Sequence, residues 1–222
     1  MIVCLEGING SGKSTIAGAI TAHWTATTGG TARHVEPVQH TSFGRSVRSA
    51  IMAAGDLDVD AEALAFGSAR LHAAVLLRPA AESTGELIVL ERWAGALMAY
   101  GAAVGTSPVL LHTLESALVD ALPIHHTFVF DVTGRTADER LLAQKNTNRF
   151  EVQGACYLEQ VRQEYLRWAR RHGVPVVDGG QSATRARALA EQIVEALAAT
   201  AAHHHRLTQT APNASRPGKL AT

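Results

Sequence analysis

The sequence predicts an α/β fold, a parallel sheet of five strands that is flanked by helices on both faces. Five short apolar runs alternate with longer helical stretches along the 222 residues. Each run is apolar almost throughout, which is typical of strands buried on both faces. The first run leads through a glycine-rich loop into a helix, as expected for the opening unit of such a sheet. A chain of this length is expected to form one domain.

The elements follow one another in a regular order. The first strand run reads Ile-Val-Cys-Leu, the second ends in Glu-Pro and the third ends in Glu-Arg-Trp. We expect strands at residues 2–5, 32–36, 87–90, 127–131 and 174–177. We expect helices near residues 13–26, 43–54, 60–82, 94–103, 109–121, 135–144, 151–172 and 183–200. In a doubly wound fold of this kind, ligands bind beyond the carboxyl ends of the strands.

The last twenty residues differ from the rest. Three histidines at 203–205 are followed by Thr, Pro, Asn, Ser, Gly and Lys without an apolar period. This composition predicts a disordered tail at 203–222 after a single domain at 1–202.

The overall composition excludes several classes of protein. The 20 Lys and Arg residues balance the 20 Asp and Glu residues, so a long nucleic-acid track is not expected. No apolar run approaches the length of a membrane span, and no basic segment precedes the first strand as in a secretory signal. The two cysteines do not suggest a disulfide framework. We therefore expect a cytoplasmic protein that binds neither membranes nor nucleic acid.

The glycine-rich loop matches a phosphate-binding pattern in full. Residues 7–15 read G-I-N-G-S-G-K-S-T and fit G-x-x-x-x-G-K-[ST] between a strand and a helix, which predicts a P-loop NTPase fold. Glycines let backbone N–H groups turn toward phosphate oxygens, and the helix N-terminus adds its positive dipole end. We expect Lys13 to reach the β- and γ-phosphates and Ser14 to hold Mg²⁺. The expected ATP-binding residues of this loop are Gly7, Ile8, Asn9, Gly10, Ser11, Gly12, Lys13, Ser14 and Thr15.

Charged residues follow two further strands. Glu91 and Arg92 end the third strand, where a carboxylate can orient Mg²⁺ through water and a guanidinium can clamp a phosphate. A surface ion pair is the alternative interpretation. Glu36 precedes Pro37 at the end of the second strand and is expected to face an acceptor, or else to be a simple turn carboxylate.

Two other groups of residues suit nucleotide binding. Phe66 and Arg70 are four residues apart on one helix, so their side chains can form a platform for a flat base, although such an aromatic is often a core residue. The segment 135–151 carries Arg135, Arg140, Lys145 and Arg149. It could form a basic lid, near 141–151, that closes over phosphates, or a solvated helix face.

As a set, these residues resemble the thymidylate kinases, P-loop enzymes that phosphorylate dTMP, over about residues 1–198. Residues 6–15 resemble the family's E-G-x-[DE]-G-x-G-K-[ST]-T, and Phe66 to Arg70 match its F-x-x-x-R. Residues 36–48 resemble its E-P-G-G-T segment and the arginine that follows, and Glu91-Arg92-Trp93 stands at its D-R-[YH]. Tyr100 has the spacing of the family's sugar-side tyrosine, residues 131–151 match its D-V-x-P-E-x-x-x-x-R and lid D-R-x-E, and residues 165–169 resemble its Y-L-x-L-A.

The resemblance implies a five-stranded parallel sheet, ATP with Mg²⁺, small-molecule nucleotides as substrates, and usually a homodimer. It implies that the catalytic residues are Lys13, Arg92, Arg149 and Glu91, and that Arg140 also binds ATP. The acceptor nucleotide would be bound by Glu36, Arg48, Phe66, Arg70, Arg92 and Tyr100. Ser14 and Glu91 would hold the metal, Glu91 through water.

The chain also departs from the family pattern. Asn9 and Glu91 each replace an aspartate or similar acid, Val38-Gln39-His40 replace glycines, and Asn148 replaces an aspartate in the lid. The base-reading polar residues are replaced by Ala96, Leu97 and Met98, and Leu97 cannot accept a hydrogen bond from thymine N3–H.

Two alternative functions follow from these departures. The segments Glu36-Pro37-Val38 and Glu91-Arg92 also resemble the deoxynucleoside kinases, in which Glu36 would be the general base for a neutral 5′-hydroxyl. A non-catalytic ATP-binding regulator is the third hypothesis. The predicted arginine cluster favours a nucleotide acceptor, because two phosphates that repel each other need cations around them.

Overall fold

The structure of the chain is a computed structural model that describes residues 1–82, 85–144, 154–181, 185 and 188–199. Its strands are β1 (Ile2–Glu6), β2 (Thr31–Val35), β3 (Glu86–Glu91), β4 (His126–Asp131) and β5 (Val176–Asp178). Its helices are α1 (Lys13–Thr28), α2 (Pro37–His40), α3 (Ser42–Ala53), α4 (Val59–Glu82), α5 (Ala94–Val104), α6 (Pro108–Ala121), α7 (Gly134–Gln144) and α8 (Gly154–His172). Residues 188–199 form a further helical segment.

The five strands form one sheet in the order β2-β3-β1-β4-β5, and every pair of neighbours is parallel. Strand β1 lies in the middle, between β3 and β4. Strands β2 and β3, which follow β1 in the chain, lie on one side of it, and the later strands β4 and β5 lie on the other side. The order therefore reverses next to β1, and a ligand crevice is expected at its carboxyl end.

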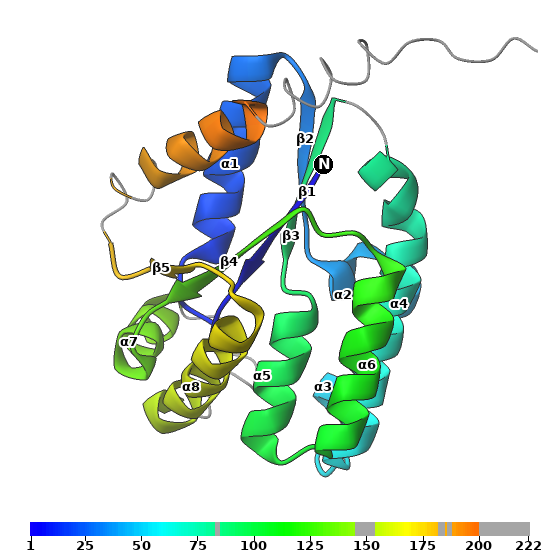
Figure 1. Cartoon of the computed structure of the whole chain (residues 1–222). Helices are drawn as coiled ribbons and strands as arrows, with labels where there is room; N and C mark the ends of the chain where they lie inside the picture. The colour runs from blue at the N-terminus through cyan, green and yellow to red at the C-terminus, as the bar shows by residue number, and fades with distance from the viewer. Residues whose placement is uncertain (83–84, 145–153, 182–184, 186–187, 200–222) are drawn as a thin grey trace, which may run out of the picture.

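Helices cover both faces of the sheet, as the sequence predicts (Figure 1). On one face, Ile2, Cys4 and Leu90 pack with residues of α4, α5 and α6. On the other face, Val3 and Leu5 pack with α1 and the helical segment 188–199. A third apolar cluster joins α5, α7 and α8 beside β4. All residues of β1 are buried, because it has a strand on each side and a helical layer on each face.

The predicted α/β fold with a parallel sheet is confirmed, and the differences are local. The edge strands β2 and β5 contain exposed residues, because each has a strand on one side only. The short helix α2 was not among the predicted elements; it begins at Pro37, whose fixed φ suits the first turn of a helix. Strand β5 begins two residues later than predicted, because the Val174 N–H still bonds to Ala169 O at the end of α8.

Parts of two predictions lie outside the described residues. Arg149 and most of the predicted lid at 141–151 belong to these parts, as does the predicted tail at 203–222. The described portion, residues 141–144, is the last turn of α7. No helix in the described part of the chain is long and apolar enough to cross a membrane.

Candidate functional site

The glycine-rich loop connects the buried strand β1 to helix α1. Gly7, Gly10 and Gly12 have φ values of 134°, 76° and 89°, a region that side chains disfavour. A Cβ on Gly7 would collide with the Phe130 carbonyl, and one on Gly10 would lie 2.6 Å from the Ala137 carbonyl oxygen. The loop conformation and its close packing therefore both require glycine.

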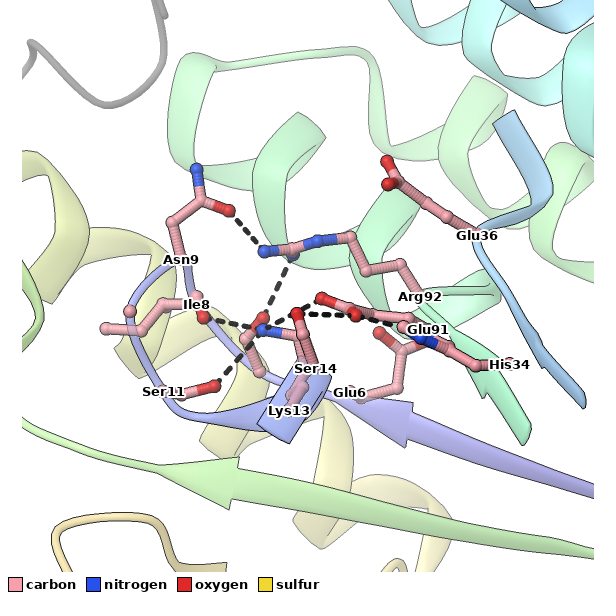
Figure 2. Close-up of polar contacts among 12 residues, drawn as sticks. Glu6, Ile8, Asn9, Ser11, Lys13, Ser14, His34, Glu36, Glu91 and Arg92 are labelled. Carbon is pink, nitrogen blue, oxygen red and sulfur yellow. Dashed lines mark hydrogen bonds and ion pairs between the residues drawn. The ribbon is translucent and has the colours of Figure 1, made fainter. Parts of the chain in front are cut away.

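Lys13 is folded across this loop. Its ammonium donates to the Ile8 carbonyl at 2.7 Å and to the Ser11 hydroxyl at 3.1 Å, and its side chain is buried (Figure 2). Burial, reinforced by the nearby charge of Arg92, lowers the pKa of Lys13 to about 7. In the free protein, burial thus disfavours the charged form of Lys13. An anion bound in the loop would stabilise that charged form.

Glu91 lies at the centre of a second group of polar contacts. Its Oε2 accepts from the Ser14 hydroxyl at 2.8 Å and lies 3.0 Å from His34 Nε2, while its Oε1 is 4.0 Å from the Lys13 ammonium (Figure 2). Burial acts to raise the pKa of Glu91, but the hydrogen bond with His34 and the charge of Lys13 outweigh it and bring the pKa to about 2. This carboxylate is therefore anionic beside the loop.

His34 was missed by the sequence reasoning. His34 stands on β2, two residues before Glu36. The register pairs His34 with Val89, so His34 lies near Glu91 at the carboxyl edge of the sheet. The same strand-end argument that identified Glu36 and Glu91 could have identified His34. That argument would have placed His34 near the site, but a histidine inside a short strand belongs to no motif. Only the structure shows that its partner is Glu91.

Arg92 is the single described non-glycine residue with positive φ, at 72°. Its Nη1 donates to the Gly7 carbonyl at 2.9 Å and to the Tyr165 hydroxyl at 3.2 Å, and its Nη2 donates to Asn9 Oδ1. Its guanidinium also lies over the Tyr100 ring, 5.2 Å from the centroid. Asn9 thus contacts Arg92 as a neutral amide in the position where the related pattern has an acid.

Phe66 and Arg70 share one face of α4, as predicted. The Arg70 guanidinium lies 5.7 Å from the Phe66 ring centroid, and its Nη1 donates to the Phe66 carbonyl at 3.2 Å. Arg70 is buried, and its Nε has no hydrogen-bond partner in the part of the chain that the structure describes. A buried donor without a partner is costly, and Arg70 is held in this way next to the cavity that it lines.

These groups open into one cavity of about 830 Å³ at the carboxyl ends of the central strands. The predicted residues that line it are Asn9, Gly10, Ser11, Gly12, Lys13, Ser14, Thr15, Glu36, Arg48, Phe66, Arg70, Glu91, Arg92, Tyr100 and Arg140. Gly7 and Ile8 shape the loop from behind and are not among its lining residues. The structure therefore brings together nearly all of the described residues that the sequence predicted to bind nucleotides.

Beside the predicted Arg140, the cavity has a wall after β5 that was not predicted. Arg140 Nη1 donates to the carbonyls of Gly10 and Gly179, each at 3.0 Å, which joins α7 to the loop after β5. Asp178, Gly179 and Gln181 of that loop also line the cavity. Polar residues after a strand are common, so their sequence gives no distinguishing signal.

Comparisons with known proteins point to a single family. The family model described as thymidylate kinase matches residues 5–206. The thymidylate kinase of Cupriavidus pinatubonensis is 32% identical over 210 residues, which cover 88% of this chain and 98% of that protein. The thymidylate kinase of Nitratidesulfovibrio vulgaris is 32% identical over 196 residues (82% of this chain, 86% of that protein), and that of Burkholderia ambifaria is 30% identical over 202 residues (88% and 97%).

Proposed function

The chain belongs to the thymidylate kinase family, and from this premise we propose how its residues carry out the ATP-dependent phosphorylation of dTMP. The observation that supports the proposal is that one cavity contains both the phosphate loop and the Phe66–Arg70 pair. A kinase of this type must hold two phosphorylated substrates in line, so a single cavity with a donor end and an acceptor end is what the reaction needs.

The donor end holds ATP. The loop N–H groups and the start of α1 surround the β- and γ-phosphates, and the Lys13 ammonium moves from the loop carbonyl to the phosphate oxygens. Burial lowers the pKa of Lys13 to about 7 in the free protein, so its charged form is strongly stabilised when a polyphosphate binds beside it. Arg140 and the loop after β5 bind the nucleoside part of ATP.

Ser14 and Glu91 are suited to hold Mg²⁺. A hydroxyl and an anionic carboxylate 2.8 Å apart are hard oxygen ligands of the kind that Mg²⁺ prefers, with Glu91 acting through water. When bound, the ion neutralises charge on the transferring phosphoryl group. Ser14 and Glu91 would hold the ion, and Lys13 adds a positive charge beside Glu91.

The acceptor end holds the monophosphate. Phe66 stacks on the base, Arg70 donates to its edge, and Tyr100 packs against the sugar. Arg92 and Arg48 hold the acceptor phosphate, with Glu36 at the entrance. Three arginines along this end suit an anionic acceptor rather than a neutral 5′-hydroxyl. Arg149, outside the described residues, is proposed to close over the transferring group.

The two buried residues Ala96 and Leu97 line the base end of the cavity. Neither can accept a hydrogen bond from a base, so stacking and Arg70 supply the recognition. We therefore propose that the enzyme tolerates dUMP as well as dTMP, since the acceptor on the base that Arg70 requires is present in both.

The test is a coupled ADP-release assay with ATP and Mg²⁺ against dTMP, dUMP, dCMP, dAMP, dGMP, UMP, thymidine and deoxycytidine. Turnover with dTMP, at a lower rate with dUMP and without thymidine, is the expected result. Activity with nucleosides alone would overturn the proposal and make Glu36 the base. Lys13→Ala should reduce kcat by about 100-fold or more, and near-normal turnover would contradict the assignment of the phosphate loop.

We further propose that the enzyme is a cytoplasmic homodimer, as the family resemblance implies. Exposed apolar side chains on α4 and α6, among them Val75, Leu76, Val109 and Val119, support an interface on these helices. Light scattering after size exclusion should give twice the mass of one chain. A mass of one chain at micromolar concentration would contradict the dimer.

A further inference from the structure

Arg92 adopts a backbone conformation that it would not choose by itself. A positive φ in a residue with a side chain costs on the order of 1 kcal/mol, and it persists where the surroundings hold it in place. Arg92 is held from its guanidinium: both N–H donors of Nη1 bond to protein oxygens, and Nη2 bonds to Asn9. These partners together set the direction in which the guanidinium points.

Tyr165 supplies one of these partners from a distant element. It stands on α8, is 1% exposed, and its hydroxyl accepts from Arg92 Nη1 at 3.2 Å. The same hydroxyl donates to Glu6 Oε2 at 3.3 Å. Its ring meets the Tyr100 ring edge to face, with centroids 6.1 Å apart, and Tyr100 in turn covers the guanidinium. Tyr165 thus contacts Arg92 directly by its hydroxyl and indirectly by its ring.

Glu6 completes the arrangement at the end of β1. It is fully buried, and its Oε1 accepts from the Trp93 backbone N–H at 2.8 Å. The Ala96 N–H is a further donor to this carboxylate. These two N–H groups belong to the start of α5, where Trp93 itself provides no side-chain cap. Glu6 therefore holds the first turn of α5 and the Tyr165 hydroxyl at the same time.

Neither Tyr165 nor Glu6 lines the cavity in which the nucleotides are proposed to bind. Both residues act on Arg92, which does line the cavity: Tyr165 contacts it directly, and Glu6 contacts Tyr165. The contacts from Glu6 through the Tyr165 hydroxyl to Arg92 Nη1 hold one end of a guanidinium whose residue lines the cavity, and its remaining N–H groups are left for a ligand. The orientation of these groups determines how well they meet the oxygens of a monophosphate, because guanidinium–phosphate bonds depend strongly on direction.

We propose that Tyr165, supported by Glu6, is a positioning residue that aims Arg92 at the phosphate of the acceptor nucleotide. The inference rests on the proposed function, in which Arg92 holds that phosphate. It assigns to Tyr165 a specific task, the recognition of the acceptor phosphate, and no part in binding the base, the sugar or ATP. No proton or bond is transferred through the chain of contacts.

The test compares the binding of dTMP with that of thymidine, which lacks the phosphate. Tyr165→Phe keeps the ring and removes the hydroxyl. We expect it to weaken dTMP binding about tenfold, measured by calorimetry, and to leave thymidine binding within about twofold of wild type. The KM for dTMP should rise by a similar factor while the KM for ATP stays within about twofold.

The control is Glu159→Gln on the same helix. Glu159 accepts from the Gly134 N–H at 2.8 Å and from Arg162, and it does not line the cavity. This variant loosens the docking of α8 without touching Arg92, so it should change neither ligand's affinity. If Tyr165→Phe weakens thymidine and dTMP equally, or changes neither, Tyr165 is only structural and the proposal is wrong.

A second variant guards against misfolding of the first. Glu6→Gln keeps the size of the side chain but weakens its hold on the Tyr165 hydroxyl, and it should shift the dTMP-to-thymidine preference in the same direction. An unchanged preference in a folded Glu6→Gln protein would also overturn the proposal. Failure of the proposed function is seen separately, because wild type would then bind thymidine as tightly as dTMP.

Discussion

At the scale of the residue, the protonation of Lys13 is expected to change when an anion binds in the loop. Its ammonium is buried among loop oxygens, and burial lowers its pKa to about 7. A bound triphosphate favours the charged form, so the pKa of Lys13 is higher in the complex than in the free protein. Between these two pKa values the free protein lacks a proton that the complex holds.

ATP binding should therefore take up a proton above about pH 7, and the affinity should fall as pH rises through that value. The uptake approaches one proton per ATP at about pH 8.5, measured by calorimetry in two buffers with different ionisation heats. Lys13→Met should abolish the uptake. Arg135→Gln, which removes an exposed cation on α7, should leave it unchanged. Equal uptake in wild type and Lys13→Met would show that another group titrates.

His34 is the second residue whose effect can be isolated. Its contact with Glu91 Oε2 at 3.0 Å holds the carboxylate that also accepts from Ser14. His34→Ala frees this carboxylate at a cost of about 1 kcal/mol, so the Mg²⁺ concentration for half-maximal activity should rise about fivefold. His23→Ala on α1 is the control. An unchanged Mg²⁺ titration in His34→Ala would rule out a contribution of His34 to the metal position.

Residues with a motif were predictable, and residues without one were not. Lys13, Ser14 and the glycines follow from the loop pattern, and Phe66 and Arg70 follow from helical spacing together with the family's F-x-x-x-R pattern. His34 has no motif, and the motif that contains Tyr165 does not reveal its partners. Both residues act through contacts between elements that are far apart in sequence. Such contacts depend on the register of the strands and the packing of α8. Neither is encoded in a local pattern.

At the scale of the element, the start of α5 depends on close packing. Gly95 lies where a Cβ would be 2.9 Å from both the Glu6 carboxyl carbon and Cζ3 of Trp168. A side chain there would push Glu6 away from the Trp93 N–H or move Trp168. This clash exceeds the gain in helix propensity that replacing glycine normally brings.

Gly95→Ala should therefore lower the free energy of unfolding by about 1–3 kcal/mol, measured by urea denaturation. The matched control is Gly18→Ala, which places the same methyl group on exposed α1 with nothing within 4 Å. This change should raise the free energy of unfolding by about 0.5–1 kcal/mol. If both variants were stabilised alike, the packing of Gly95 against Glu6 would not limit α5.

Elements with a clear apolar pattern were placed well by the sequence. Strands β1 and β3 agree with the predicted runs to within one residue at each end. Helix α2 was missed because four residues are too few to show a period, and Pro37 was taken as the exit of a strand. The short edge strand β5 shifted because the end of α8 competes for the same backbone groups.

At the scale of the whole molecule, the parallel sheet follows from the sequence but the strand order does not. The second run carries Arg33, His34 and Glu36, but the other runs are mostly apolar, so their pattern does not tell which one is central. The order β2-β3-β1-β4-β5 results from the crossover connections. This order has a consequence for function, because it places the phosphate loop at the most protected point of the sheet and the loop after β5 at its edge.

Hydrogen exchange should reveal this gradient. Strand β1 is paired on both sides and fully buried, and β3 is buried along its centre, so their amides should exchange only on global unfolding. Strands β2 and β5 are paired on one side and partly exposed, so they should exchange faster.

Adding ATP and dTMP together should slow exchange in residues 7–12 and in the first turn of α5, because both segments border the one cavity. ATP alone should protect the loop but not α5, since α5 borders the acceptor end. Protection of α5 by ATP alone would mean that the donor and acceptor ends are coupled before the second substrate arrives.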